Sequence, residues 1–236
     1  MRDASSLTDE QTSVMQQTST LRASQTSRRP LWLLGGFWFC VVIALAVVLR
    51  RLVEFAHPSH GRPPQMAAID ATFASHELIT ILHIVPAAIF VILAVAVLLR
   101  RTTSNWLERL FFLFGAITGA TAYAMTLYAI GGWVERSAVL VFDTWFLFSL
   151  GRAYWFRFHG ENAPKREWMT RAVAILLGIA TTRPVMGFFF ATSPRTHLSP
   201  NQFFGIAFWI GFSINAIVIE LWLHSRRHAQ LHLPST

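Results

Sequence analysis

The chain has 236 residues, of which 53% are hydrophobic and only 14% are charged. Soluble domains average about 25% charged residues, so this composition excludes an ordinary soluble domain and indicates a protein surrounded by lipid. The formal net charge of +8 does not indicate nucleic-acid binding, because the basic residues stand at the ends of apolar runs, where Arg contacts lipid phosphate. The single cysteine, Cys40, lies within an apolar run, which excludes a disulfide framework.

The amino-terminal segment, residues 1–29, is rich in Ser, Thr and Gln. Such a segment cannot bury enough apolar surface to offset the entropy lost on ordering. We therefore predict a polar tail that becomes ordered only against a partner. The segment is too polar, and too long before the first apolar run, to be a cleavable signal peptide, and we expect none.

Six apolar runs follow the tail, and each is close to the ~20 residues with which a helix crosses a bilayer. They cover residues 31–53, 77–100, 106–130, 135–157, 167–191 and 201–224. Because lipid cannot pair with backbone N–H and C=O groups, a helix is the open structure that can span it. The sequence therefore predicts an all-α, polytopic membrane protein with a bundle of six transmembrane helices over residues 30–225, followed by a basic, His-containing tail at residues 226–236.

The distribution of Lys and Arg predicts the orientation of these helices. Alternate threading puts twelve basic residues on the side that holds both termini and five on the other side. The positive-inside rule then places both termini in the cytoplasm, and we expect a multi-pass protein of a bacterial inner membrane. Arg50 and Arg51 are the discordant pair on the outer side. They precede the longest connector, whose second half, Met66 to Glu77, predicts a short interfacial helix.

Small residues and prolines mark the packing of the predicted helices. Gly115 and Gly119 form a GxxxG pattern in the third helix, a smooth face on which another backbone can approach closely. This face serves either a contact inside the bundle or a homodimer. Pro86 and Pro184 lie inside the second and fifth helices and predict a kink in each.

Three ionisable residues at membrane depth form a candidate ligand site. His83, Asp143 and Arg183 lie at similar depth from the outer side, roughly 12 Å for the last two at 1.5 Å per residue. Because ionisable groups in lipid are costly, they face the bundle interior, and Asp143 and Arg183 on adjacent antiparallel helices are natural partners. The cluster is compatible with a structural charge pair, with a site for a quinone head, a lipid head or a small anion, and with a proton or ion path.

His83 has three interpretations of its own. It is a hydrogen-bonded core histidine, a ligand of a quinone carbonyl, or the single axial ligand of a pigment. A pair of stacked haems is not supported, because no second histidine lies at a matching depth. The sequence requires no cofactor and contains no P-loop, nucleotide fingerprint, Gly-x-Ser-x-Gly, HExxH or CxxC motif. His224, His228 and His232 have a spacing that suits a metal on one helix face, but we interpret them as part of a basic interfacial tail and predict no metal site.

A second layer of polar residues lies nearer the predicted cytoplasmic side. Arg152 and Arg171 stand one to two turns from the inner ends of their helices, Glu220 stands one turn from the end of the last helix, and Asn215 is deeper. A Glu220 carboxylate between the two guanidinium groups would satisfy both of them. We interpret this layer as a structural charge layer that fixes helix register.

The carboxy-terminal half carries a resemblance to a known family. The motif is Trp168-Met169-x-Arg171, followed by Arg183, Asn215 and Glu220, and preceded by His83-Ile84 in the second helix. Over roughly residues 77–224 this pattern resembles the bacterial predicted-membrane-protein family filed as domain of unknown function twenty-three-oh-six. The resemblance implies a helical membrane domain and directs attention to these residues; the family implies no particular reaction.

The absence of a catalytic motif favours a non-catalytic role. We expect an accessory or stabilising subunit of a larger membrane complex, energy-transducing in photosynthesis or respiration, with lipids and other membrane subunits as partners. The 9 Trp and 20 Phe residues and the polar tail motivate this expectation. The alternatives are a quinone- or tetrapyrrole-binding redox protein, with His83, Asp143 and Arg183 at its site, and a small proton-coupled transporter.

Overall fold

The computed structural model describes residues 30–57, 64–99 and 104–231. The predicted tail at residues 1–29 and the end of the chain after residue 231 lie outside the described residues. The chain divides into two units, residues 1–38 and residues 39–236. The described part of the first unit is the beginning of one helix. The helix bundle lies within the second unit.

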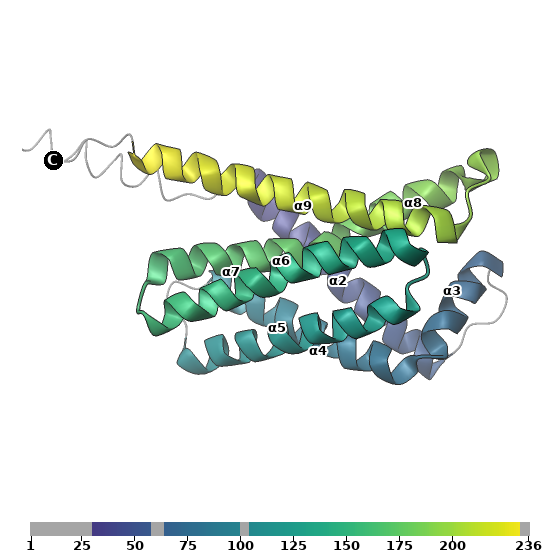
Figure 1. Cartoon of the computed structure of the whole chain (residues 1–236), viewed down its shortest axis with the longest axis horizontal. Coiled ribbons are helices and arrows are strands. Elements are labelled where there is room, and N and C mark those ends of the chain that lie inside the picture. The colour runs from purple at the N-terminus through teal and green to yellow at the C-terminus, as the bar shows by residue number, and fades with distance from the viewer. Residues whose placement is uncertain (1–29, 58–63, 100–103, 232–236) are drawn as a thin grey trace, which may run out of the picture. The chain divides into compact units, whose positions relative to one another are not determined.

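The described residues form helices and contain no β-strand, which confirms the all-α prediction. The helices in Figure 1 are α2 (Leu31–Ala56), α3 (Pro64–Ala74), α4 (Glu77–Leu99), α5 (Asn105–Met125), α6 (Gly132–Phe158), α7 (Asn162–Leu176), α8 (Gly178–Thr196) and α9 (Pro200–Leu231), with a 3-10 turn η1 (Thr126–Tyr128). Helix α3 lies where the interfacial helix is predicted. Helix α9 continues beyond the predicted end of the last span and into the predicted tail.

Five helical segments in the described ranges are long and apolar enough to cross a membrane. They are Leu31–Ala56, Glu77–Leu99, Asn105–Tyr128, Asn162–Thr196 and Pro200–His228. These segments correspond to five of the six predicted spans, and the prediction of a polytopic, membrane-embedded helical protein is confirmed.

Helix α6 corresponds to the remaining predicted span and is not among those five. It has 27 residues, so its length is sufficient. Its composition is less apolar, because Glu135, Asp143 and Arg152 lie along it. The helix nevertheless packs against α5, α7 and α9 and so lies inside the bundle.

Neighbouring helices pack as pairs within the second unit. Helix α4 lies against α5, α6 against α7, and α8 against α9 (Figure 1). The GxxxG face of α5 is used in this packing. A Cβ added at Gly115 would come within 2.8 Å of the Phe90 and Leu150 side chains, and one added at Gly119 would overlap Leu147. The small residues therefore serve helix contact inside the chain.

The fifth predicted span is interrupted at Leu177, between α7 and α8, and not at Pro184. Both Pro184 in α8 and Pro86 in α4 lie within continuous helices. Close packing accompanies the interruption. A Cβ added at Gly178 would lie 3.0 Å from the Phe212 Cα, which is on α9. On the two sides of Leu177 the packing partner differs: α7 lies against α6 and α8 lies against α9.

Candidate functional site

A cavity of about 440 Å³ lies inside the second unit. His83, Asp143 and Arg183, the three residues of the predicted ligand site, all line it. Every α-helix from α2 to α9 contributes to its wall. Small-molecule sites typically measure about 300–1,000 Å³, so the cavity is large enough for a ring-sized ligand.

His83 presents a hydrogen-bond acceptor to this cavity. Its Nδ1 lies 3.0 Å from the Thr121 hydroxyl oxygen. The Thr121 hydroxyl has one hydrogen, which it donates to the carbonyl of Ile117 or Thr118 at 2.8 or 3.0 Å. When the hydroxyl hydrogen goes to one of these carbonyls, the Thr121 oxygen accepts from an N–H at His83 Nδ1. A neutral imidazole then carries a lone pair on Nε2, and no described residue donates to that atom.

Asp143 and Arg183 have unused hydrogen-bonding positions. Asp143 Oδ2 and Arg183 Nε are both buried without a hydrogen-bond partner among the described residues. The only hydrogen bond from the Arg183 side chain in that part of the chain is a weak one, from Nη1 to Met186 Sδ at 3.7 Å. A buried polar group without a partner costs about 1–3 kcal/mol, which a ligand that supplied the partner would recover.

The direct pair that we predicted between Asp143 and Arg183 is not formed in the described part of the chain, where no hydrogen bond or ion pair joins them. The prediction assumed that one continuous helix runs beside α6. The interruption at Leu177 sends the second half, α8, against α9, so α8 is not closely packed on α6. The two side chains line one cavity from separate walls.

The end of the cavity near α3 carries charges that do have partners. Arg51 Nη1 lies 2.7 Å from Asp70 Oδ1, and its guanidinium lies 4.3 Å from the centre of the Phe73 ring. Arg50 lies 3.7 Å from the same Asp70 carboxylate. The Asp70 carboxylate on α3 thus pairs with both Arg50 and Arg51, the two arginines whose predicted outer position departs from the positive-inside rule. Nearby, Glu135 accepts a 2.6 Å hydrogen bond from the Gly131 backbone N–H.

Residues 39–56 of α2 form one wall of the cavity, and their backbone makes few close approaches to the other helices in the described ranges. Val41 and Ala44 are buried there, and polar side chains join α2 to its neighbours at two places. One is the ion pair between Arg51 and Asp70, and the other is a contact of 3.7 Å between Cys40 Sγ and Thr181 Oγ1 on α8. Helices α4 and α8 do not pack closely either, so α2 covers the space between them.

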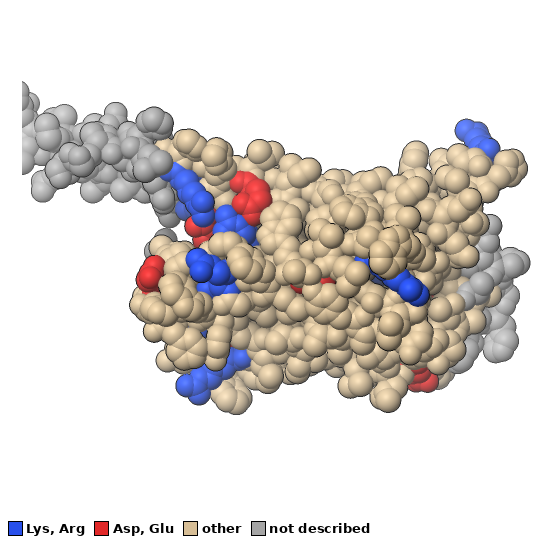
Figure 2. Space-filling model, in the orientation of Figure 1, with Lys and Arg blue, Asp and Glu red and all other residues tan. Residues whose placement is uncertain are grey.

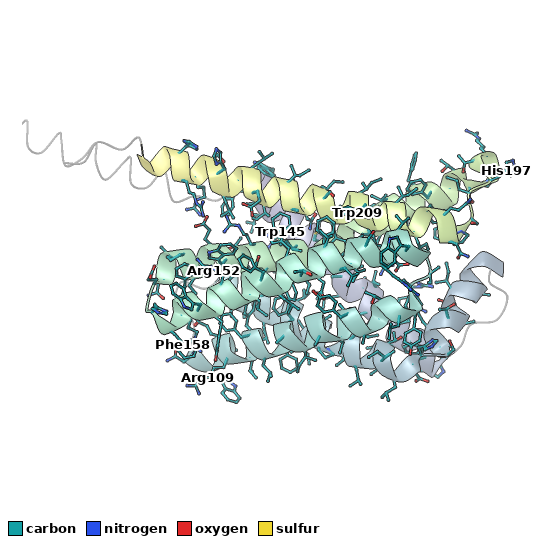
Figure 3. The ribbon with its side chains drawn as sticks, viewed as in Figure 1. Arg109, Trp145, Arg152, Phe158, His197 and Trp209 are labelled. Atoms are coloured by element: carbon teal, nitrogen blue, oxygen red, sulfur yellow. The ribbon has the colours of Figure 1, made fainter. Side chains whose placement is uncertain are left out.

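Phenylalanine rings form much of the remaining wall. The ring-bearing lining residues include Phe73, Phe142, Phe146, Phe190, Phe204, Phe208 and Phe212. The Phe142 and Phe212 rings are stacked, with centroids 5.2 Å apart and planes 18° apart. Trp209 on α9 lies against α6, where its indole N–H donates to the Ser137 hydroxyl at 3.2 Å (Figure 3). The cavity therefore combines flat apolar walls with a few polar groups.

The opposite end of the bundle carries the second polar layer, and Figure 2 shows charged side chains gathered near the end of α6 and the end of α9. Glu108 on α5 is its buried centre, only 7% exposed. Its carboxylate lies 3.1 Å from Arg157 Nε and 2.9 Å from Lys165 Nζ. One acidic side chain therefore joins α5, α6 and α7. Glu108 stands in the first turn of α5, and its two partners lie 49 and 57 residues further along the chain.

Arg171 and Glu220 form the ion pair that the sequence predicts, with Arg171 Nη2 donating to Glu220 Oε2 at 3.1 Å. Glu167 also contacts Arg171, at 3.4 Å. Arg152 does not share the Glu220 carboxylate, which corrects that part of the prediction. Its guanidinium lies 4.9–5.7 Å from the centres of three aromatic rings, those of Phe156, Trp155 and Trp168, because its position on α6 faces the start of α7 (Figure 3).

Asn215 acts in helix packing and does not belong to an ionic layer. Its Nδ2 donates to the Ala174 carbonyl at 3.0 Å, and its Oδ1 accepts from the Thr181 hydroxyl at 2.7 Å. The Thr181 oxygen in turn accepts from the Cys40 thiol, because its own hydrogen is already donated. Asn215 thus connects α9 to both sides of the interruption between α7 and α8.

The described residues contain no group of three or more His, Cys, Asp or Glu side chains that could hold a metal ion. Comparison with protein-family models, with curated proteins and with solved structures finds no match for this chain. The resemblance to the family of unknown function therefore stays a prediction based on its motif.

Proposed function

We propose that this protein is a membrane-embedded binding protein for a lipophilic ligand with a polar head, which occupies the cavity lined by His83, Asp143 and Arg183. The observation that carries the proposal is that one cavity brings together the unpartnered Asp143 Oδ2 and Arg183 Nε and a His83 ring whose one hydrogen bond among the described residues is at Nδ1. Ligand sites combine apolar walls with a few placed polar groups in this way. Intramembrane ionisable residues commonly mark such sites.

The covering helix α2 supports a lipophilic ligand in particular. A ligand that reaches the cavity from the bilayer must pass between helices, and α2 is held to its neighbours at the two side-chain bridges described above. We infer that α2 moves to admit the head group while the tail remains in lipid. We also propose the bacterial inner membrane, with both termini in the cytoplasm, as the location.

The predicted role as an accessory subunit of a photosynthetic or respiratory complex stays a prediction. Large apolar side chains such as Trp106, Phe148 and Phe188 are more than half exposed. Such a surface can contact either lipid or a neighbouring subunit, so it does not distinguish a separate protein from a subunit of a complex. A subunit that binds the ligand would be compatible with both the accessory role and the ligand-binding role. A tetrapyrrole ligated by His83 and a proton path through Asp143 are the remaining alternatives.

The test is to purify the protein in mild detergent and to identify small molecules in an organic extract by mass spectrometry. We expect one lipophilic compound at close to one per chain. Ala122→Phe adds a ring inside the cavity, because Ala122 on α5 is part of its lining. Ala120→Phe is the matched control, because Ala120 is an exposed residue of the same helix.

The proposal expects the compound to be lost from Ala122→Phe and kept by Ala120→Phe. Equal retention in both folded variants would place the compound outside the cavity and contradict the proposal. An optical spectrum of the same preparation decides the nature of the ligand further. A Soret band that disappears in His83→Leu would identify a tetrapyrrole instead.

A further inference from the structure

We infer that the ligand head is a dihydroxylated aromatic ring, the reduced form of a lipid-soluble quinone, and that the cavity binds this form in preference to the oxidised quinone. This inference rests on the proposed function and names the ligand of the same site. Some polar atoms of the cavity need a hydrogen-bond donor and others need an acceptor, and the reduced ring supplies both. The inference concerns binding alone and involves no electron transfer.

His83 requires a donor from the ligand. With the Thr121 hydrogen donated within its own helix, His83 gives its Nδ1–H to the Thr121 oxygen and offers only a lone pair at Nε2. A quinone has two carbonyl oxygens, which accept hydrogen bonds and donate none. A quinone would therefore leave His83 Nε2 without a partner, whereas the hydroxyl group of the reduced ring donates to it directly.

Arg183 and Asp143 impose complementary requirements. Arg183 can only donate, and its buried Nε–H needs an acceptor. Asp143 offers an acceptor oxygen in both of its protonation states, because even the neutral carboxyl group keeps its carbonyl oxygen. The ligand must therefore donate and accept at once. A hydroxyl group does both, and two hydroxyl groups on one ring can reach separate walls.

The walls favour an aromatic ring over other hydroxylated heads. The stacked Phe142 and Phe212 rings, with Phe73, Phe146 and Phe190 elsewhere in the lining, provide flat apolar surfaces on which a ring can pack. An anionic lipid head fits less well. Asp143 and Glu135 line the same cavity as Arg183, while Arg50 and Arg51 are paired with Asp70, so the cavity offers a phosphate no cluster of free cations among the described residues.

The test compares three compounds that share one decyl-substituted benzenoid ring. They are the hydroquinone, the corresponding quinone, and the dimethyl ether of the hydroquinone, which keeps the substituents but cannot donate a hydrogen bond. Binding to the full chain in detergent is measured anaerobically by equilibrium dialysis, with each compound quantified by mass spectrometry. We expect the hydroquinone to bind about tenfold or more tightly than either of the others, because each loses the donor to His83.

Variants of the lining residues test which side chains cause the preference for the hydroquinone. His83→Leu removes one of the two acceptors and should reduce the preference for the hydroquinone over its ether by about threefold or more. Asp143→Asn adds an N–H donor and should strengthen quinone binding relative to the hydroquinone. Arg152→Gln is the control, because Arg152 lies on aromatic rings outside the cavity lining. It should leave all three affinities unchanged.

Failure of the hydroquinone assignment can be distinguished from failure of the proposed function. If none of the three compounds binds while another lipophilic compound is retained in the cavity, the ring assignment is wrong and the proposed function stands. If no lipophilic compound binds at all, the proposed function fails with it. If the quinone binds as tightly as the hydroquinone, the inference about the reduced form is wrong. An unchanged preference in His83→Leu also overturns it.

Discussion

The buried carboxylate of Glu108 gives the sharpest test of how the bundle is held together. Its side chain is 10% exposed, and those of its partners Arg157 and Lys165 are 18% and 12% exposed. Glu108→Gln removes the negative charge and leaves two mostly buried cations facing each other. Removal of one partner from a buried ion pair costs about 3–5 kcal/mol. Because all three side chains keep some exposure, we expect the lower end, about 3 kcal/mol.

The assay is unfolding in mixed micelles with increasing sodium dodecyl sulfate, followed by circular dichroism. Glu161→Gln is the matched control, because Glu161 is an exposed residue in the turn between α6 and α7. Its effect should stay within about 0.5 kcal/mol. Lys165→Met combined with Glu108→Gln should cost less than the sum of the single changes, because contacting residues couple by about 0.5–3 kcal/mol. Equal losses for Glu108→Gln and Glu161→Gln would refute the buried ion-pair account.

Two further predictions concern helix packing and use the same assay. Gly119→Ala forces a methyl group against Leu147 and should destabilise by about 1–3 kcal/mol, whereas Gly151→Ala meets open space and should be neutral or stabilising by up to about 1 kcal/mol. A Gly119→Ala protein as stable as Gly151→Ala would show that α5 and α6 are not in close contact there. Asn215→Ala removes partners from a carbonyl and a hydroxyl and should cost about 1–3 kcal/mol, against less than about 0.5 kcal/mol for the exposed Asn201→Ala. Similar losses at the two asparagines would contradict the bridging role.

Hydropathy predicts the helices of this chain well, because lipid imposes one strong requirement on every span: length and apolarity together. The alignment of depths also brought His83, Asp143 and Arg183 to one cavity. When successive spans cross the membrane in alternating directions, the position of a residue along its span gives its depth, and the predicted depths of these three residues are similar. The charge pair of Arg171 and Glu220 could be predicted for the same reason.

The lateral arrangement could not be predicted, because hydropathy carries no information about which helices are neighbours. No proline marks the interruption at Leu177, where Gly178 packs closely against Phe212 of α9. Beyond it α8 lies against α9, and Arg183 on α8 forms no pair with Asp143 on α6 among the described residues. The hydrogen bond between His83 and Thr121 could not be predicted either, since a lone threonine in an apolar helix usually bonds its own backbone.

The central claim is that the cavity holds a polar, ring-bearing ligand. The most direct measurement is a density map of the protein in lipid nanodiscs made from its native membrane. The account predicts non-protein density beside the Phe142 and Phe212 rings, within hydrogen-bond distance of His83 Nε2 and Arg183. A cavity filled only by protein side chains, or by ordered water on all three polar groups, would contradict it.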